Sequence, residues 1–375
     1  MIGRSDPPHI QSYNRGLEGL IVGSTDISRL DGSEGKLYYR SYDVEDLARH
    51  CCFEEVSYLI LHGSLPNAVK LEEWRSELVQ WRNPPKEAFA ALDRIPGDAH
   101  PLAQYRTMLT VAACHIPEPE NTHLDAQWRR PARILSWASS LAAAAIRHLE
   151  GLPPLQPRDD LPFAQHILYQ SLGRVPSEME TKAFEASLIV QAEHGLHAAA
   201  FAALVVISTG ADLGSAVLAG MGALSGVRHG GANQLSFEML RRLEGPDHAH
   251  AWVKEKVREG FRFPGFGHRV YKCPDPRVRA LEPHASALLK AKGLEGMWDT
   301  YSALRETVES ELGGKGIYAN VDSITGLVYH PLGLPASAFP IPFCLAIQTG
   351  WMAHCLEYLP GGAMIEPGSV YLADR

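Results

Sequence analysis

The segment from Ala198 to Leu224 is rich in alanine, valine, leucine and glycine, and Asp212 is its single charged residue. Helices that are apolar on every side are buried, and small side chains let neighbouring helices approach closely. A chain that contains such a segment therefore needs other helices to surround it. We predict a mainly helical protein in which residues 198–224 form buried helices.

Helix signals recur elsewhere in the chain. Asp43 is placed to cap a helix whose first turn is acidic. Phe53, Val56 and Ile60 follow at the spacing of one helical face, and Gly63 marks the end of this helical region.

Other segments indicate the remaining organisation. Ser177 and Glu180 form a capping box that opens another helix. Residues 36–40 are expected to form a short strand or hairpin arm, but no β-α-β alternation and no repeat is found. Residues 331–353 carry no charged side chain, yet their four prolines would break a membrane-spanning helix. We expect a buried connection that runs into a core helix.

The composition excludes several classes of protein. The chain has 375 residues, a net charge of −8 and no basic run, which argues against a general nucleic-acid partner. Its six cysteines include no C-x-x-C pair, so neither a zinc knuckle nor a disulfide framework is indicated. The N-terminus has no apolar signal core, and we expect a cytoplasmic protein.

Four polar clusters interrupt otherwise apolar sequence. In the first, Glu193 precedes His194 and His197, so the zinc-protease patterns, in which a glutamate lies between two histidines, do not fit. Without a functional role, the two histidines would simply face the core. A metal site is not predicted here, and residues 247–250, with two more histidines, are expected to be a solvated loop.

The other three clusters are also ambiguous when each is taken alone. Paired glycines follow His229, and a Gly-x-Gly sequence precedes His268. Either would serve as an ordinary tight turn or as a place where backbone approaches a ligand. Asp322, in the segment 320–323, would most often be a cap or turn residue.

Together, the clusters resemble the signatures of the citrate synthase family in order, residue type and spacing. The resemblance covers nearly the whole chain and includes the segments Gly16–Gly19, Arg40–Asp43, Leu61–Pro66, His100-Pro101, Arg106-Thr107, His229–Asn233, Gly267–Lys272, Asp275–Arg277, Asn320–Asp322 and Gly350–His354. It implies an all-α fold with a large helical domain (residues 1–229 and 333–375) and a small domain (230–332) that closes over the active site. It also implies a homodimer, for which residues 198–224 offer a contact surface.

The resemblance implies a Claisen-type condensation, in which the methyl group of an acyl-CoA is deprotonated and attacks a carbonyl. This proton is very weakly acidic, so a base and a donor to the enol oxygen must act together. Asp322 would be the base, His229 the donor to the thioester oxygen, and His268 the group that polarises the acceptor carbonyl. Acetyl-CoA, or a related short acyl-CoA, would be the substrate and CoA a product, with no bound cofactor or metal.

The same resemblance assigns the coenzyme contacts. Pro264, Gly265, Phe266 and Gly267 would present backbone groups to the adenine of CoA. Lys272 would contact a phosphate.

The acceptor pocket departs from the family pattern on one side. His194 and Arg277 match family residues that hold acceptor oxygens. An asparagine of the family is replaced by His197, and a Pro-Leu pair before the catalytic His229 is replaced by a pair that ends in Arg228.

Two arginines that grip substrate carboxylates in the family are also replaced. One is Ile347, three residues before Gly350; the other is Glu366, at a position that reaches into the partner subunit's site in the family. A buried carboxylate without its cation costs several kcal/mol, on the order of 3 to 5. The replacements therefore argue against the usual binding of oxaloacetate.

Three hypotheses follow from this combination. The leading one is condensation of acetyl-CoA, or a short acyl-CoA, with another acceptor: a 2-oxo acid with an apolar or amino-bearing tail, or a phosphonate analogue. The second is ordinary citrate or 2-methylcitrate synthesis in which Arg228 supplies a relocated cation. The third is a non-catalytic homologue that binds acyl-CoA.

Overall fold

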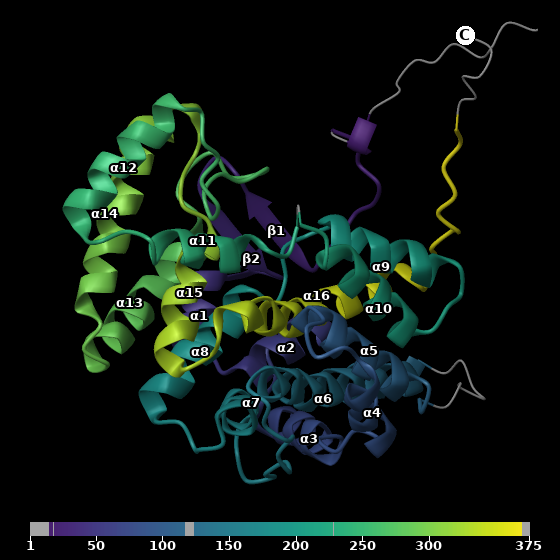
Figure 1. Cartoon of the computed structure of the whole chain (residues 1–375). Coiled ribbons are helices and arrows are strands. Elements are labelled where there is room, and N and C mark those ends of the chain that lie inside the picture. The colour runs from purple at the N-terminus through teal and green to yellow at the C-terminus, as the bar shows by residue number, and fades with distance from the viewer. Residues whose placement is uncertain (1–14, 18, 117–123, 228, 370–375) are drawn as a thin grey trace, which may run out of the picture.

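The computed structural model describes residues 15–17, 19–116, 124–227 and 229–369. Within these ranges the protein consists of sixteen α-helices, a few short 3₁₀ turns and one small sheet (Figure 1). The all-α prediction is confirmed. In the same ranges, no helix is both long enough and apolar enough to cross a membrane.

The sheet is a short antiparallel meander near the N-terminus. Its strands are β1 (Ser28–Asp31), β2 (Lys36–Tyr39) and β3 (Tyr42–Asp43), in the order β1-β2-β3, with Arg29 opposite Tyr38. The predicted strand at residues 36–40 is therefore confirmed as the central strand β2.

Most of the helices form one large group. They are α1 (Val44–His50), α2 (Phe53–His62), α3 (Ala68–Gln80), α4 (Lys86–Ala90), α5 (Pro101–Ala113), α6 (Leu124–Leu149), α7 (Phe163–Leu172), α8 (Glu178–Val190), α9 (Ala198–Ser208), α10 (Leu213–Leu224) and α16 (Pro340–Tyr358). The centre of this group is α16, which packs against α2, α5, α6, α8, α9 and α10. All but one of its residues from Pro340 to Cys355 are buried.

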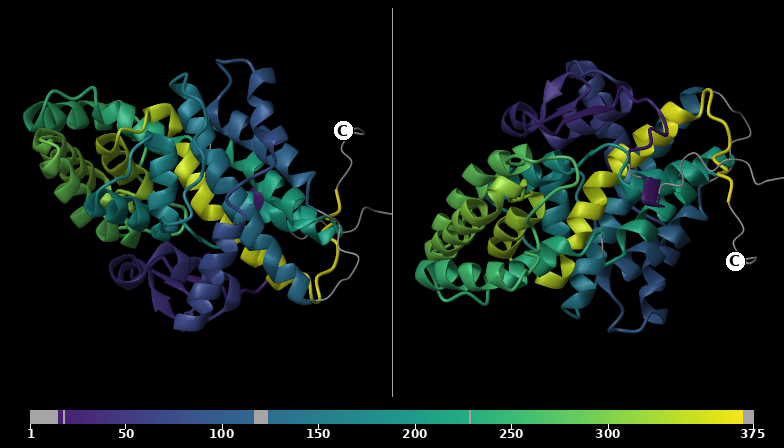
Figure 2. Two further views of the ribbon diagram at one scale, coloured as in Figure 1. Left: turned by 90° about the horizontal axis from the view of Figure 1, so that it is seen from below. Right: turned by 90° about the horizontal axis from the view of Figure 1, so that it is seen from above.

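A second group of helices lies to one side of the first (Figure 2). It comprises α11 (Ala232–Leu240), α12 (Pro246–Arg258), α13 (Pro276–Ala291), α14 (Glu295–Leu312) and α15 (Val321–Leu332). These helices pack on one another, and α13 and α15 also contact α8 of the first group.

The helix boundaries follow local capping chemistry. The expected helical region after Asp43 is divided into α1 and α2, because Cys52 and Glu55 form a capping box that starts a new helix. Gly63 ends α2 with a positive φ of 90°, a conformation that glycine adopts without strain. The capping box at Ser177 opens α8 as predicted.

Two expectations about buried and exposed segments have different outcomes. Residues 331–353 pass through the end of α15 and a short turn into buried α16, which confirms the expected connection. The solvated loop expected at residues 247–250 is wrong: these residues lie in α12, which has Pro246 in its first turn, and His250 is hydrogen-bonded to Thr307 at 2.6 Å.

The apolar segment 198–224 forms α9 and α10, which pack on each other and on α16. Its inward-facing side is buried, for example at Ala203 and Leu204, but Phe201, Val206 and Leu218 are only partly buried. In the single chain, one side of α9 and α10 is therefore buried as expected, and the other side is only partly buried.

The contact between α10 and α16 depends on a missing side chain. A β-carbon at Gly220 would lie 2.6 Å from the indole ring of Trp351, whereas one at Gly222 would meet only the end of Arg106 at 3.7 Å. We expect Gly220→Ala to lower the free energy of unfolding by about 1 to 3 kcal/mol through overpacking. Gly222→Ala, the control in the same helix, should be neutral or stabilising by up to about 1 kcal/mol. Urea unfolding of both variants measures this; equal effects would contradict the assigned contact.

Candidate active site

Four segments that are distant in sequence meet beside the N-terminus of α15. The turn between α8 and α9 carries His194 and His197, and the turn between α10 and α11 carries His229. The loop that leads into α13 carries His268, and Asp322 lies in the first turn of α15. The site therefore draws on both groups of helices.

His268 is held with one ring nitrogen facing inward to the backbone. Its Nδ1 accepts hydrogen bonds from the amides of Val270 at 3.0 Å and Tyr271 at 3.1 Å. Burial, assisted by the charge of Arg277, lowers the pKa of His268 to about 4, so the ring is neutral near pH 7. Because both amides are donors, its proton is assigned to Nε2, which is then available as a hydrogen-bond donor.

His194 lies against His268. The centroids of the two rings are 5.0 Å apart, and His194 Nε2 lies 3.3 Å from the hydroxyl of Tyr271. Burial and the nearby Arg277 charge lower the pKa of His194, so this ring is neutral as well. Tyr271 stacks on His268 at 4.7 Å and so contacts both histidines.

His197 lies between Trp351 and His229, the second histidine predicted to be catalytic. Its Nδ1 lies 3.2 Å from Nε2 of His229, and its Nε2 accepts a hydrogen bond from the indole of Trp351 at 3.3 Å. Burial lowers the pKa of His197 to about 3 and also lowers the pKa of His229. Both rings are neutral near pH 7.

Arg277 is buried and already partly neutralised. Its Nε and Nη2 form a two-pronged ion pair with Asp275, at 3.0 and 2.7 Å. Burial opposes the charged form, but the Asp275 carboxylate outweighs it and raises the pKa of Arg277. Among the described residues no acceptor is found for Nη1, which leaves one face of the guanidinium for a ligand.

Asp322 is positioned by the cap of α15. Its amide donates to the side chain of Asn320 at 3.0 Å, while its own carboxylate has no hydrogen-bond partner among the described residues. Burial raises the pKa of Asp322 to about 6, with Arg277 opposing the shift and Asp275 adding to it. A carboxylate in this state is a stronger base than one in water.

Glu193 anchors the turn that holds His194 and His197. This buried carboxylate accepts hydrogen bonds from His354 at 3.0 Å, from Ser28 at 2.8 Å and from the amide of Gly195. Burial raises its pKa, but the His354 interactions outweigh that effect, so the pKa of Glu193 is lowered and that of His354 is raised. Glu193 thus connects the site to α16 through His354 and to β1 through Ser28.

The predicted coenzyme loop is hydrogen-bonded to the segment that leads into α15. The Gly265 carbonyl and the Gly267 amide pair with residues 318–320, and Asn320 Nδ2 also donates to the Gly267 carbonyl at 2.7 Å. Pro264 and Phe266 are partly exposed beside them. These contacts hold the loop against residues 318–320, next to Asp322 at the start of α15.

Lys272 lies at the exposed rim of this loop. Its Nζ donates to the carbonyl of His268 at 2.9 Å, and its amide donates to Gly32 in the β1–β2 turn. The side chain is free to exchange this neutral contact for an anionic one.

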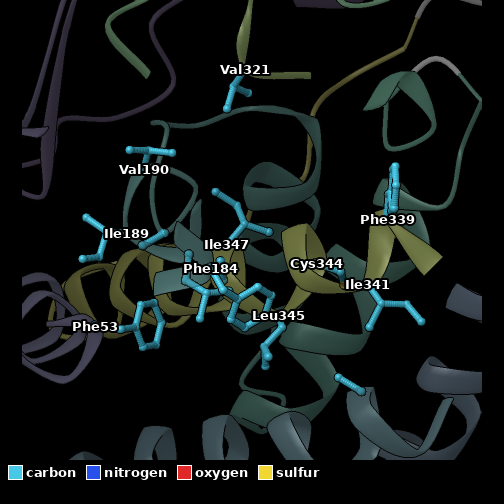
Figure 3. Close-up of a cluster of buried hydrophobic side chains, with 14 of the residues drawn as sticks. Phe53, Phe184, Ile189, Val190, Val321, Phe339, Ile341, Cys344, Leu345 and Ile347 are labelled. Carbon is cyan, nitrogen blue, oxygen red and sulfur yellow. The ribbon is translucent and has the colours of Figure 1, made fainter. Parts of the chain in front are cut away.

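Ile347 is 1% exposed and belongs to the apolar cluster drawn in Figure 3, together with Val190 and Val321. It lies four residues before Trp351 and seven before His354 in α16, so the three side chains share one helical face. Because Trp351 contacts His197 and His354 contacts Glu193, this face points toward the α8–α9 turn.

The remaining predicted residues are not part of this cluster. Glu366 is exposed in the extended C-terminal tail, whose neighbouring residue Ile365 is bonded to Ser208 at the end of α9 (Figure 1). The chain does not bring Glu366 to its own site. Arg228 lies outside the described residues.

Sequence reasoning named neither Tyr271 nor Trp351 as a site residue. Both residues lie inside motifs that carry the family resemblance, Gly267–Lys272 and Gly350–His354, but nothing in the sequence assigns either of them a role. In the described ranges, no cluster of three or more potential ligands is arranged to hold a metal ion.

The arrangement combines a base, two neutral imidazoles and one partly free guanidinium. Asp322 can accept a proton, His268 and His229 can donate hydrogen bonds without carrying charge, and Arg277 can bind an anion. These are the parts needed to stabilise an enolate and polarise a carbonyl.

Comparison with known proteins places the chain among close structural relatives. Residues 16–368 match the family model described as "Citrate synthase, C-terminal domain". A citrate synthase of Haloferax volcanii is 34% identical, with 96% of each chain covered, and a 2-methylcitrate synthase of Mycobacterium tuberculosis is 33% identical, with 95% and 90% covered. A crystal structure of Thermoplasma acidophilum citrate synthase in a ternary complex with carboxymethyl coenzyme A and oxaloacetate superimposes with a TM-score of 0.90, at 29% identity over 96% and 95% of the chains.

The raised pKa of Asp322 gives a pH-dependent effect on stability. Its pKa is about 6 in the folded protein against an ordinary value of 3.8, so the folded state favours the protonated form and stability falls as pH rises between these values. We expect Asp322→Asn to stabilise the protein at pH 8 by up to about 3 kcal/mol, and to have little effect at pH 4. Thermal unfolding at both pH values measures this. Asp299→Asn, on the exposed surface of α14, is the control; a stabilisation independent of pH would contradict the assignment.

Proposed function

The chain belongs to the citrate synthase family, and from that premise we propose that it condenses acetyl-CoA, or a related short acyl-CoA, with a 2-oxo acid other than oxaloacetate. The acceptor in this proposal carries one carboxylate and an apolar tail. The observation that carries the proposal is Ile347, a buried apolar residue where the family resemblance leads us to expect a carboxylate-binding arginine.

The acceptor's single carboxylate would bind to the free side of Arg277, with His194 beside it. Arg277 already shares its charge with Asp275, so it is suited to one further carboxylate. The tail of the acceptor would lie toward Ile347, and apolar groups bind apolar surfaces favourably. A second carboxylate at this place would be buried without a cation, which costs several kcal/mol, on the order of 3 to 5.

The reaction would begin with removal of a methyl proton from the acyl-CoA by Asp322. The electron pair moves into a new carbon–carbon double bond, and the enolate oxygen accepts a hydrogen bond from His229. The enolate carbon then attacks the acceptor's carbonyl carbon, and the carbonyl electron pair moves onto its oxygen. This oxygen accepts a hydrogen bond from Nε2–H of His268 and takes its proton from solvent water, while Asp322 returns the proton that it removed to solvent. Water hydrolyses the thioester of the product and releases the CoA thiol.

Two further features of the proposal concern the whole protein. Residues 230–332 would form a small domain that closes over residues 1–229 and 333–375, because enolisation needs water to be excluded. The partly exposed apolar faces of α9 and α10 would be covered by a second subunit, whose C-terminal tail could then present Glu366. Pro264–Gly267 and Lys272 would hold the coenzyme.

The choice of acceptor is tested with a panel of 2-oxo acids and acetyl-CoA, with release of free thiol as the readout. We expect kcat/KM for monocarboxylic 2-oxo acids with small apolar tails to exceed that for oxaloacetate by about 100-fold or more, because a buried carboxylate without a cation costs on the order of 3 to 5 kcal/mol and each 1.4 kcal/mol is about a factor of ten. Robust turnover of micromolar oxaloacetate would instead support ordinary citrate or 2-methylcitrate synthesis. Exchange of acetyl methyl protons with deuterated water that stops in Asp322→Asn would exclude a non-catalytic binding protein.

Restoring the expected arginine tests the role of Ile347 directly. We expect Ile347→Arg to raise kcat/KM for oxaloacetate about tenfold or more and to lower it for apolar acceptors, because the pocket gains a cation. It should also reduce stability in the absence of substrate, since the new charge is buried. Ile347→Met, a similar length without charge, is the control and should change neither preference. An arginine variant that leaves the acceptor preference unaltered would show that Ile347 lies away from the acceptor.

A further inference from the structure

The contact between His197 and His229 has a direction that the structure defines. An indole nitrogen can only donate a hydrogen bond, so Nε2 of His197, 3.3 Å from Nε1 of Trp351, must be the unprotonated nitrogen. A neutral imidazole carries one proton, so that proton lies on Nδ1. His197 Nδ1 therefore donates to Nε2 of His229, 3.2 Å away.

The position of the proton on His229 follows from that of His197. Its Nε2 accepts from His197, so a neutral His229 carries its proton on Nδ1. The opposite arrangement would require His197 to be protonated on Nε2, with that proton facing the proton of the Trp351 indole. Two donors facing each other in a buried position make no hydrogen bond and leave both groups unsatisfied.

Neutrality of both rings is supported by their surroundings. His197 is enclosed by His229, Trp351 and the base of the α8–α9 turn, and its pKa is lowered to about 3, first by burial and then by the neighbouring imidazole. The pKa of His229 is lowered as well, again by burial.

We propose that His197 is a positioning residue that transmits the orientation of the Trp351 indole to His229, fixing His229 as the Nδ1-protonated tautomer so that Nδ1–H is the donor for the acyl thioester oxygen. The inference rests on the proposed function for the role of that donor, but not for the tautomer itself. The usual asparagine at this position would give one amide donor and one carbonyl acceptor, so an imidazole supplies the same pair in a different shape.

Trp351 is held firmly enough to fix the orientation of the hydrogen bonds that run through His197 to His229. It is fully buried in α16, and Gly220 of α10 lies directly against its ring. The indole therefore cannot turn away from His197 without displacing α10. The two catalytic imidazoles are thus set by donors alone: His268 by two backbone amides and His229 by the indole through His197.

The experiment measures the His229 tautomer in the substrate-free protein by ¹⁵N NMR of histidine-labelled samples, because protonated and unprotonated ring nitrogens differ strongly in chemical shift. The His229 signal is identified by its loss in His229→Gln. We expect Nδ1–H in the wild type, and a mixture or Nε2–H in both Trp351→Phe and His197→Leu. Trp137→Phe removes another buried indole, whose Nε1 has no hydrogen-bond partner in the described residues, and should leave the tautomer unchanged.

Catalysis is then followed as deuterium exchange into the methyl group of acetyl-CoA. We expect His197→Leu to lower the exchange rate about 100-fold, as for loss of one oxyanion donor, with little change in KM for acetyl-CoA. His197→Asn keeps a donor and an acceptor and should lose less than about tenfold.

Two results would overturn the proposal: His229 protonated on Nε2 in the wild type, or an unchanged tautomer in His197→Leu. The expected tautomers with no methyl exchange in the wild type would confirm the assignment and reject the proposed function instead.

Discussion

The burial of α16 on nearly every side is the constraint on which the rest of the structure depends. A helix of this composition is stable only when other helices cover it, and α2, α5, α6, α8, α9 and α10 do so. Its one face carrying Ile347, Trp351 and His354 then determines three features of the site. His354 anchors the α8–α9 turn through Glu193, and Trp351 donates a hydrogen bond to His197. Ile347 places a buried apolar side chain on the face of α16 that points toward this turn.

The electrostatics of the site follow from burial in the same way. Burial makes the charged form of each imidazole costly, so His194, His197, His229 and His268 are neutral near pH 7, and it raises the pKa of Asp322 to about 6. Neutral donors beside a basic carboxylate do not quench it, as an imidazolium would. Burial thus makes the Asp322 carboxylate more basic and keeps the four imidazoles neutral.

Sequence reasoning predicted what is local and missed what is distant. The capping box at Ser177, the strand at residues 36–40 and the buried connection into α16 each have a signal within a few residues. The candidate site residues follow from the family resemblance, and their roles stay predictions. The contact between Trp351 and His197 joins positions 154 residues apart, and no local pattern encodes it. The helix at residues 247–250 was mistaken for a loop because its polar residues face outward.

The same physics explains how the position of Ile347 can depart from the family pattern while the other candidate site residues keep their contacts. Asp322, His268 and Arg277 lie in or just before α15 and α13, and His229 lies in the α10–α11 turn, whereas Ile347 lies on α16 and takes part in none of their hydrogen bonds. Replacing a cation by an apolar side chain there removes a buried charge, and with it the need for an anionic partner to keep the helix stable. In the proposed function, an acceptor whose far end is apolar fits this arrangement, because that end leaves no charge unpaired beside Ile347.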